Sequence, residues 1–254
     1  MKVLLVRPSV GGRDPSNKSE SLSLGYIAAV LRRDGHEVEI FDSQLAGSSP
    51  SDTIRRIAAT DFDCLGITAM HEHKNSLIST VRGVRKQKKD AIIIAGGYLP
   101  SLAAPELLAL CPEIDFIVRG EGEITTSDVL GRIERGEEWR DAPGVAFVRD
   151  KELVMNPLPP LIQDIDSLPF PARDTLMHEK SIPSALATSS RGCYHRCAFC
   201  SVNTFYMLHG NHAPRQRSPI NFVDELESVV SAVGIKKFSF VDDIPDRLLC
   251  VLFT

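Results

Sequence analysis

Short apolar runs alternate with segments of helical periodicity over the first half of the chain. Residues 3–6 form a continuous apolar run of strand length. Between residues 22 and 33 the apolar positions recur at steps of three and four, which predicts an amphipathic helix ended by Gly35. Residues 36–42 alternate between polar and apolar side chains, as in a strand at a sheet edge with one wetter face.

The same alternation continues to about residue 123. Apolar segments predict further strands at residues 64–70, 91–95 and 116–118. Helices are expected from residue 51, over 75–88 and over 105–110. Strands separated by helices imply right-handed βαβ units, so we expect an α/β domain with a parallel flavodoxin-like or Rossmann-like sheet.

Open parallel sheets bind ligands beyond the carboxyl ends of their strands. The candidate ligand loops therefore follow Val6, Ala69, Ala95 and Val118. In the third loop, Gly96 and Gly97 allow a bulky ligand to approach the backbone, although paired glycines also suit a tight turn without a ligand. No G-x-G-x-x-G pattern follows the first strand, which argues against a dinucleotide fold.

A hairpin and a proline-rich stretch follow the first domain. The expected hairpin strands are residues 145–148 and 152–155. Residues 157–174 are rich in proline. Because proline fixes φ and lacks a backbone hydrogen-bond donor, we expect an extended linker that runs over a surface of the protein.

A second unit begins with an expected strand at residues 184–188. A helix is expected over 223–233 and a strand over 238–243, which ends in two carboxylates. We divide the chain into three parts: an α/β domain (1–140), a hairpin and linker (141–180) and a second unit (181–254).

Composition and charge limit the classes of partner. The chain has 254 residues, a hydrophobic share of 43% and a net charge of −4, so no overall charge recruits nucleic acid or an acidic membrane. The apolar run near Met1 is too short for a signal peptide or a membrane span. Six cysteines without a leader are typical of a reducing cytoplasm, where we expect the protein to reside.

Three cysteines, Cys193, Cys197 and Cys200, lie on one short loop. Thiolates at this spacing can bind three irons of one 4Fe–4S cluster and leave the fourth iron open for chemistry. A structural Cys3His zinc site and inert thiols are the alternatives, although zinc sites usually combine two separated pairs of ligands. The histidines near the loop are His195, His209 and His212.

The run S-R-G-C-Y-H-R-C-A-F-C at residues 190–200 resembles the signature of the radical S-adenosylmethionine (SAM) enzymes. In that family the open iron binds SAM, and reductive cleavage yields a 5′-deoxyadenosyl radical. The resemblance implies that residues 181–254 begin a (β/α) barrel with the cluster at its carboxyl end. It also implies that Phe199 packs near the SAM adenine; the alternative is a core phenylalanine.

The resemblance further implies that Asp242 and Asp243 contact the amino group of SAM, since F-x-D-D replaces the more usual Gly-Gly-Glu. Paired aspartates also cap loops, which is the alternative. For Arg215 and Arg217 two interpretations are open, namely contact with anionic cofactor groups or solvation.

Residues 22–38, 95–100 and 118–123 look like segments of the cobalamin-binding domain of cobalamin-dependent radical SAM enzymes, and the resemblance runs in matching order from residue 1 to about 243. It implies that cobalamin is a cofactor beside the cluster and SAM. The implied cobalamin-binding residues are Pro8, Ser9, Thr68, Met70, Gly96, Gly97, Tyr98, Gly120, Glu121 and Gly122.

The Asp-x-His-x-x-Gly motif that supplies a cobalt ligand in other cobalamin proteins is absent, and the first loop reads S-V-G-G-R at residues 9–13 instead. Many members of the radical SAM group also lack this motif. His71 and His73 follow the third strand, but loop histidines are usually solvated, so neither is assigned to cobalt.

The resemblance implies a radical SAM protein that binds a 4Fe–4S cluster and cobalamin, accepts electrons from a flavodoxin or ferredoxin, and performs methyl transfer or a rearrangement. Because further barrel units of roughly 30 residues each would be needed, we interpret the chain as truncated, with an apolar end at 248–253 that favours aggregation. Whether it is an enzyme is therefore open, and a non-catalytic corrinoid- and metal-binding module is the alternative. A methylthiotransferase would need a further cysteine set, for which the apolar surroundings of Cys64 and Cys111 are unsuited.

Overall fold

The structure is a computed structural model that describes residues 1–10, 19–178, 182–210 and 213–244. Within these residues, seven strands form one sheet in the order β2-β1-β3-β4-β5-β6-β7. Its parallel strands are β1 (Lys2–Arg7), β2 (Glu37–Asp42), β3 (Cys64–Thr68), β4 (Ile92–Gly96) and β5 (Phe116–Val118). The order 2-1-3-4-5 is that of a flavodoxin-like sheet, which confirms the expected α/β class. Strand β2 lies at the sheet edge, as its alternating pattern predicts.

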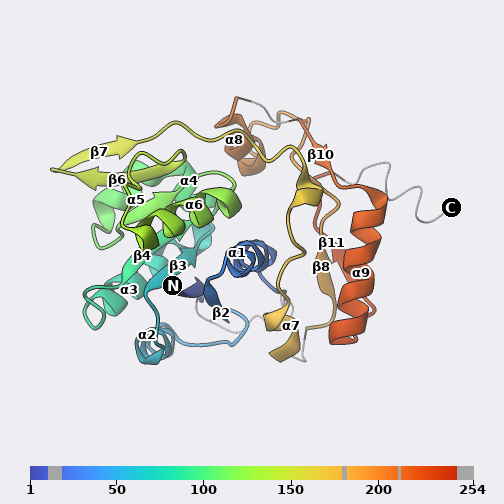
Figure 1. Ribbon diagram of the computed structural model, residues 1–254, viewed down its shortest axis with the longest axis horizontal. Coiled ribbons are helices and arrows are strands. Elements are labelled where there is room, and N and C mark those ends of the chain that lie inside the picture. Colours follow the sequence, from blue (N-terminus) through green and yellow to red (C-terminus); the bar gives the residue numbers. More distant parts are fainter. Residues whose placement is uncertain (11–18, 179–181, 211–212, 245–254) are drawn as a thin grey trace.

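Helices cover both faces of this sheet (Figure 1). They are α1 (Leu22–Arg33), α2 (Pro50–Ala59), α3 (Lys74–Arg85), α4 (Tyr98–Leu102), α5 (Ala104–Leu110) and α6 (Gly122–Arg135). Helices α2, α3 and α5 pack on one face, whereas α1 and α6 pack on the other. Neighbouring residues of a strand point to opposite faces, so the continuous apolar run of β1 supplies Leu4 and Val6 to one core and Val3 and Leu5 to the other.

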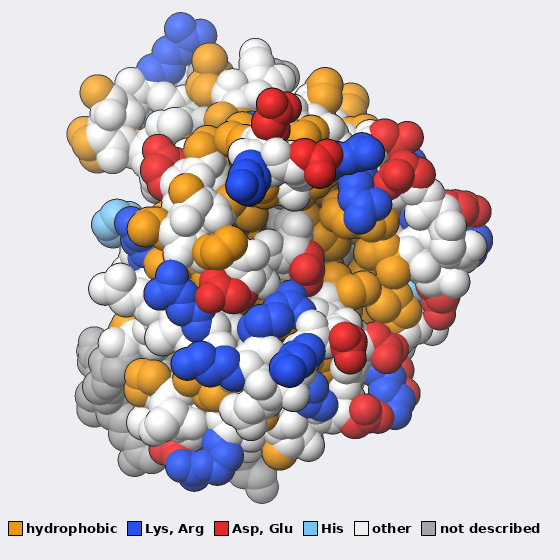
Figure 2. All heavy atoms as spheres, turned by 90° about the vertical axis from the view of Figure 1, so that its left-hand side faces the viewer, with side chains coloured by type: hydrophobic (Ala, Val, Ile, Leu, Met, Phe, Trp, Pro, Cys, Tyr) orange, Lys and Arg blue, Asp and Glu red, His pale blue; other side chains and the backbone are white. Residues whose placement is uncertain are grey.

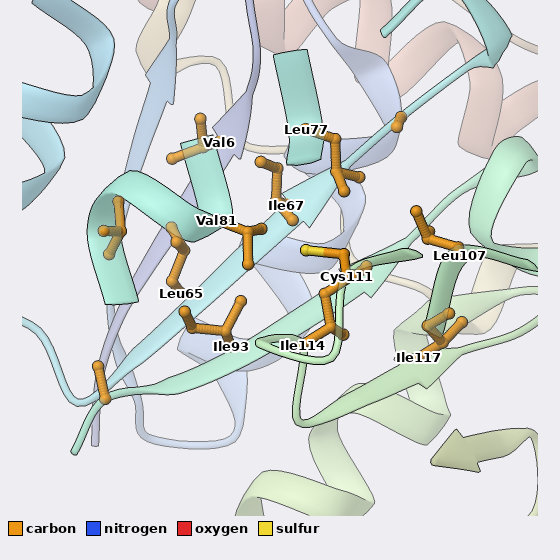
Figure 3. Close-up of a cluster of buried hydrophobic side chains, with 14 of the residues drawn as sticks. Val6, Leu65, Ile67, Leu77, Val81, Ile93, Leu107, Cys111, Ile114 and Ile117 are labelled. Carbon is orange, nitrogen blue, oxygen red and sulfur yellow. The ribbon is translucent and has the colours of Figure 1, made fainter. Parts of the chain in front are cut away.

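Figure 3 shows the core between the sheet and helices α2, α3 and α5. Leu65, Ile67 and Ile93 from the strands meet Val81 of α3, and the sulfur of Cys111 points into the same cluster. Cys111 is fully buried and free. Burial, together with the neighbouring Glu113 carboxyl, raises the pKa of its thiol to about 12.

Two helices of the first domain were not foreseen from the sequence. Helix α4 contains a proline and is only five residues long. Helix α6 buries Thr125 and Thr126 beside its leucine and valine, so its buried face lacks a clear apolar stripe. Helix α3 also ends three residues earlier than predicted, and Arg85 then donates to the carbonyls of Lys89 and Ala91.

The hairpin of β6 (Val145–Arg149) and β7 (Glu152–Met155) forms as predicted and extends the first sheet, because β6 pairs antiparallel with β5. Its turn residues Asp150 and Lys151 both have positive φ, as in a two-residue hairpin turn. Figure 2 shows the side of the molecule that lies on the left in Figure 1, where acidic and basic side chains are interspersed and hydrophobic side chains lie between them. The hairpin itself exposes Val148, Leu153 and Met155.

The proline-rich segment runs along α1, as its composition predicts (Figure 1). It contains the short helices η2 (Ile165–Ser167) and α7 (Asp174–His178). Leu168 packs against Tyr26 and Val30 of α1. The Ala172 amide donates to the Gly25 carbonyl at 3.0 Å, and a Cβ at Gly25 would stand 2.8 Å from the Ala172 oxygen, so glycine permits this close approach.

The remaining described residues, 182–210 and 213–244, form the second unit beside the linker. Strand β8 (Ala185–Ala187) pairs in parallel with β11 (Phe238–Phe240), and helix α9 (Pro219–Val233) precedes β11. Strand β9 (Ser190–Arg191) pairs antiparallel with β10 (Arg215–Gln216), and α8 (Ser201–Met207) lies between them in the chain. Strand β11 is shorter than predicted, since its pairing ends before the two aspartates.

None of the helices in the described part of the chain is both long and apolar enough to cross a membrane. Three features from the sequence lie outside the described residues, namely the 11–13 part of the first loop, His212 and the apolar segment 248–253.

Candidate functional site

A cavity of about 370 Å³ opens beyond the carboxyl ends of β3, β4 and β5, between the first sheet and the second unit. Most of its lining is apolar, from α1, the strand ends and α8. Eight of the ten residues expected to contact cobalamin line it: Thr68, Met70, Gly96, Gly97, Tyr98, Gly120, Glu121 and Gly122. Pro8 and Ser9 lie at the end of β1 and do not line the cavity.

The loop after β4 narrows one side of the cavity. Gly97 has φ of +93°, a conformation that favours glycine, and a Cβ there would stand 2.7 Å from Thr68 Oγ1. The loop is held by the Ala69 amide, which donates to the Gly96 carbonyl at 3.1 Å, and by the Leu99 amide, which donates to the Ala69 carbonyl at 3.0 Å. Gly96 and Gly97 therefore present only backbone at this part of the rim.

We expect Gly97→Ala to destabilise the protein by about 1–3 kcal/mol, because alanine is strained at this φ and its methyl group displaces Thr68. The displaced Thr68 lies in the cavity wall, so cobalamin retention should also fall. Gly136→Ala is the matched control, since Gly136 also has positive φ, +69°, but no atom lies within 4 Å of its Cβ position. Urea unfolding and cobalamin titration of both variants measure the two effects. Equal cobalamin affinity in both variants would contradict the placement of Gly97 at the ligand.

Residues 119–123, here the glutamate segment, run from the end of β5 into the first turn of α6, and buried ion pairs join them to the second unit. Arg215 donates to both carboxylate oxygens of Glu121 at 2.8 and 2.9 Å, and Arg191 lies 3.2 Å from one of them. Burial raises the pKa of Glu121, but the hydrogen bonds and charges of these two arginines outweigh it and hold the pKa below its ordinary value. The Ile162 amide also donates to Glu121, at 2.8 Å. The Glu121 carboxylate is thus fully engaged within the protein.

A second buried ion network contacts β8 through Leu186. Arg173 of the linker bridges Glu20 and Glu225, and Arg217 pairs with the other oxygen of Glu225. The solvated interpretation of Arg215 and Arg217 is therefore wrong, because each arginine is buried against a carboxylate of the protein itself. Neither arginine lines the cavity, and their contact with anionic cofactor groups stays a prediction. No sequence motif marks Glu20 or Glu225, so this network was missed.

The three cysteines follow β9 on one loop, residues 192–200, here the cysteine loop. Cys193 and Cys200 are half-buried, Cys197 is exposed, and all three are free thiols. The Cys200 amide donates to the Cys197 carbonyl at 3.1 Å. Over residues 1–10, 19–178, 182–210 and 213–244, no three His, Cys, Asp or Glu side chains are placed to hold one metal ion. A cluster binds each thiolate through a different iron, so its ligands do not meet at one ion.

Asp242 fixes the chain just before the cysteine loop. Its Oδ1 accepts from the Ser189 amide at 2.9 Å, the Ser189 hydroxyl at 2.8 Å and the Ser190 hydroxyl at 2.6 Å. Asp243, the next residue, lines the cavity instead. Burial raises the pKa of Asp243 above its ordinary value, although the Gly192 amide donates to it and partly offsets that effect.

Phe199 is 92% exposed, so the core-phenylalanine alternative is wrong. It does not line the cavity. His209 Nδ1 donates to the Pro159 carbonyl at 2.9 Å, and Gly120 lies against the other ring nitrogen of His209.

The two histidines after β3 do not line the cavity either. His71 is exposed, whereas His73 is buried and its Nδ1 accepts from the Met70 amide at 3.3 Å. Burial lowers the pKa of His73, which keeps the ring neutral for this contact.

Comparison with known proteins gives one family match. The family model described as a B12 binding domain matches residues 9–130. Among curated proteins, an uncharacterized methyltransferase of Pyrococcus horikoshii is 30% identical over 96% of this chain and 53% of its own length. The anaerobic magnesium-protoporphyrin IX monomethyl ester cyclase of Synechocystis is 27% identical over 96% of this chain and 50% of its own length. The chain thus spans about half the length of the curated relatives it matches.

Solved structures share the fold. The cobalamin-dependent SAM radical enzyme OxsB, with aqua-cobalamin and SAM bound, matches 95% of this chain and 34% of its own chain, with a TM-score of 0.80 and 21% identity. The radical SAM methyltransferase TsrM from Kitasatospora setae, with cobalamin and a [4Fe-4S] cluster bound, matches 95% of this chain and 47% of its own, with a TM-score of 0.73 and 19% identity.

Proposed function

Because the chain belongs to the radical SAM proteins that carry a B12-binding domain, we propose that it binds a 4Fe–4S cluster, SAM and cobalamin for radical chemistry on a substrate. The outcome of that chemistry is methyl transfer or a rearrangement. The observation that carries the proposal is the cavity, which is lined both by the loops of the B12-binding domain and by residues on either side of the cysteine loop.

The cavity fits a corrinoid in three respects. It lies beyond the carboxyl ends of parallel strands, where open α/β sheets bind ligands. Its lining is mainly apolar, which suits the face of a large ring. Gly96 and Gly97 carry no side chains at the rim after β4, so a large ring can approach the backbone there.

The cysteine loop fits an iron–sulfur cluster by its donors. Cys193, Cys197 and Cys200 are free thiols in one stretch of nine residues, and thiolates are the ligands that such clusters require. The Asp242 hydrogen bonds hold Ser189 and Ser190, so the loop starts from a fixed point. When bound, the cluster would supply the electron for reductive cleavage of SAM, and cobalamin would supply methyl-transfer chemistry.

The chain's own residues then bind SAM and orient it. Asp243 faces the cavity next to the cysteine loop and accepts a charge-assisted hydrogen bond from the ammonium of SAM. That ammonium favours the charged carboxylate and lowers the pKa that burial has raised. Phe199 is exposed in the structure, and contact between its ring and the SAM adenine is part of the proposal. The electron comes from a flavodoxin or ferredoxin, and the reaction takes place in the cytoplasm.

Anaerobic reconstitution with iron and sulfide tests the proposal. We expect the reduced protein to give the electron paramagnetic resonance signal of a 4Fe–4S cluster, and we expect SAM to perturb that signal by binding at the open iron. Hydroxocobalamin should remain bound through gel filtration.

Two results would contradict the proposal in different ways. A cluster signal that SAM does not change, with cobalamin retained, favours a non-catalytic corrinoid- and metal-binding module. Zinc retained in place of a cluster rules out radical chemistry for this polypeptide.

A further inference from the structure

Arg191 joins the two parts of the candidate site through a single side chain. It is the last residue of β9 and directly precedes the cysteine loop, which begins at Gly192. Its guanidinium extends into the first domain, where one nitrogen lies 2.6 Å from Glu123 Oε1 and another 3.2 Å from Glu121 Oε1. The side chains of Arg191, Glu121 and Glu123 are 12%, 7% and 8% exposed, so water scarcely screens these pairs.

The carboxylates that receive Arg191 belong to the wall of the cavity. Gly120, Glu121, Gly122 and Glu123 of the glutamate segment all line it, and so does Arg191. The guanidinium also lies 4.9 Å from the ring centre of Tyr26, which lines the cavity from α1. A displacement of the cysteine loop therefore also moves the cavity wall, because the buried contacts of Arg191 connect the two.

The two glutamates depend on Arg191 to different degrees. Glu121 keeps two hydrogen bonds from Arg215 when Arg191 is removed. Among the described residues, Arg191 is the only cation that pairs with Glu123. The bond between Arg191 and Glu123 is consequently the part of the network that no other arginine replaces.

We propose that Arg191 couples the two cofactor sites, so that a cluster on the cysteine loop tightens cobalamin binding at the glutamate segment. The inference rests on the proposed function. Cys193 is two residues from Arg191, so a bound cluster restricts the backbone that carries the guanidinium. The fixed guanidinium then holds Glu123 and Glu121 in one arrangement, and less ordering remains to be done when cobalamin binds. Arg191 is a positioning residue, since it acts through the two glutamates.

The coupling is measured by titrating hydroxocobalamin into protein with and without a reconstituted cluster and following the corrin absorbance. We expect the cluster to lower Kd about tenfold, within the usual range of coupling between sites. In Glu123→Gln, which keeps the size of the side chain and removes its charge, the ratio of the two Kd values should fall close to one. In Arg191→Lys the ratio of the two Kd values should fall also, because a single ammonium replaces the two guanidinium nitrogens that pair with the glutamates.

Asp174→Asn is the matched control. Asp174 of α7 pairs with Arg32 of α1 at 2.6 Å, so it too joins the linker side to the first domain, but neither residue lines the cavity. The control should keep the tenfold ratio. Circular dichroism and iron content confirm that each variant is folded and loaded before its ratio is taken.

Hydrogen–deuterium exchange in residues 119–126 of the unmutated chain gives a readout that needs no variant. Reconstitution of the cluster should slow exchange there in the absence of cobalamin. Unchanged exchange, or a ratio of one in the unmutated chain with both cofactors bound, overturns the coupling and leaves the proposed function intact. An unchanged tenfold ratio in Glu123→Gln overturns the role of Arg191. Failure to take up iron or cobalamin overturns both proposals.

Discussion

Replacing any one of Cys193, Cys197 and Cys200 by serine is expected to reduce the iron and sulfide bound after reconstitution to a background level. Each thiolate would bind a different iron, and a serine hydroxyl at neutral pH is not deprotonated to take its place. Formation of 5′-deoxyadenosine from SAM should be lost in all three variants. Iron and sulfide analysis, absorbance near the cluster bands and chromatography of the SAM products measure these losses together.

Cys111→Ala provides the control for cysteine substitution as such. Cys111 is fully buried in the core of the first domain (Figure 3), and it is not part of the cysteine loop. The variant should be somewhat less stable, because a core sulfur is lost, and should still take up iron. Normal iron content in Cys197→Ser, the variant at the exposed thiol, would show that this loop is not the cluster site.

The order of elements was predictable because it depends on local patterns. Apolar runs and three- and four-residue steps identified β1, α1 and β3, and the parallel direction of the strands, though not their order in the sheet, followed from their alternation with helices. The cysteine loop was predictable for the same reason, since its residues are neighbours in the chain. Helix α6 was missed because buried threonines interrupt its apolar stripe.

The contacts between the two parts of the site were not predictable, because their partners are far apart in the sequence. Arg191 and Glu123 are 68 residues apart, and Arg173 and Glu20 are 153 residues apart. A single sequence shows such residues only as isolated charges, which are usually solvated. The direction of a side chain was equally hidden: Asp242 and Asp243 are adjacent, yet one binds two serines and the other lines the cavity.

The ion network at Arg173 leads to the largest expected effect on stability. Arg173 is 8% exposed and donates to Glu20 at 2.5 Å, and it also pairs with Glu225. The same guanidinium donates to the Leu186 carbonyl at 2.9 Å, so it joins the linker to β8. Arg173→Ala leaves two buried carboxylates short of their shared cation. We expect a loss of about 3–5 kcal/mol in the free energy of unfolding near neutral pH, measured by urea denaturation.

Arg32→Ala is the matched control, because it also removes an arginine that contacts the linker segment. The side chains of Arg32 and Asp174 are 36% and 29% exposed. Water solvates both charges when the pair is broken, so the variant should lose less than about 1 kcal/mol. Similar losses in the two variants would mean that burial does not decide the contribution of Arg173.

The pH dependence of Arg173→Ala separates an uncompensated charge from a simple loss of packing. Burial raises the pKa of Glu20 above 4.5 even beside Arg173, which partly offsets the effect. Without the arginine, the pKa of Glu20 in the folded protein rises further above the pKa of Glu20 in the unfolded chain. At a pH between these two values, Glu20 is protonated in the folded protein and ionised in the unfolded chain. Stability then falls as the pH rises from the unfolded to the folded pKa, and the destabilisation by Arg173→Ala is greatest above that window. We expect the difference in the free energy of unfolding between Arg173→Ala and the unmutated chain to shrink as the pH is lowered toward about 5. A difference that stays constant or grows on acidification would assign the loss to packing around the linker instead.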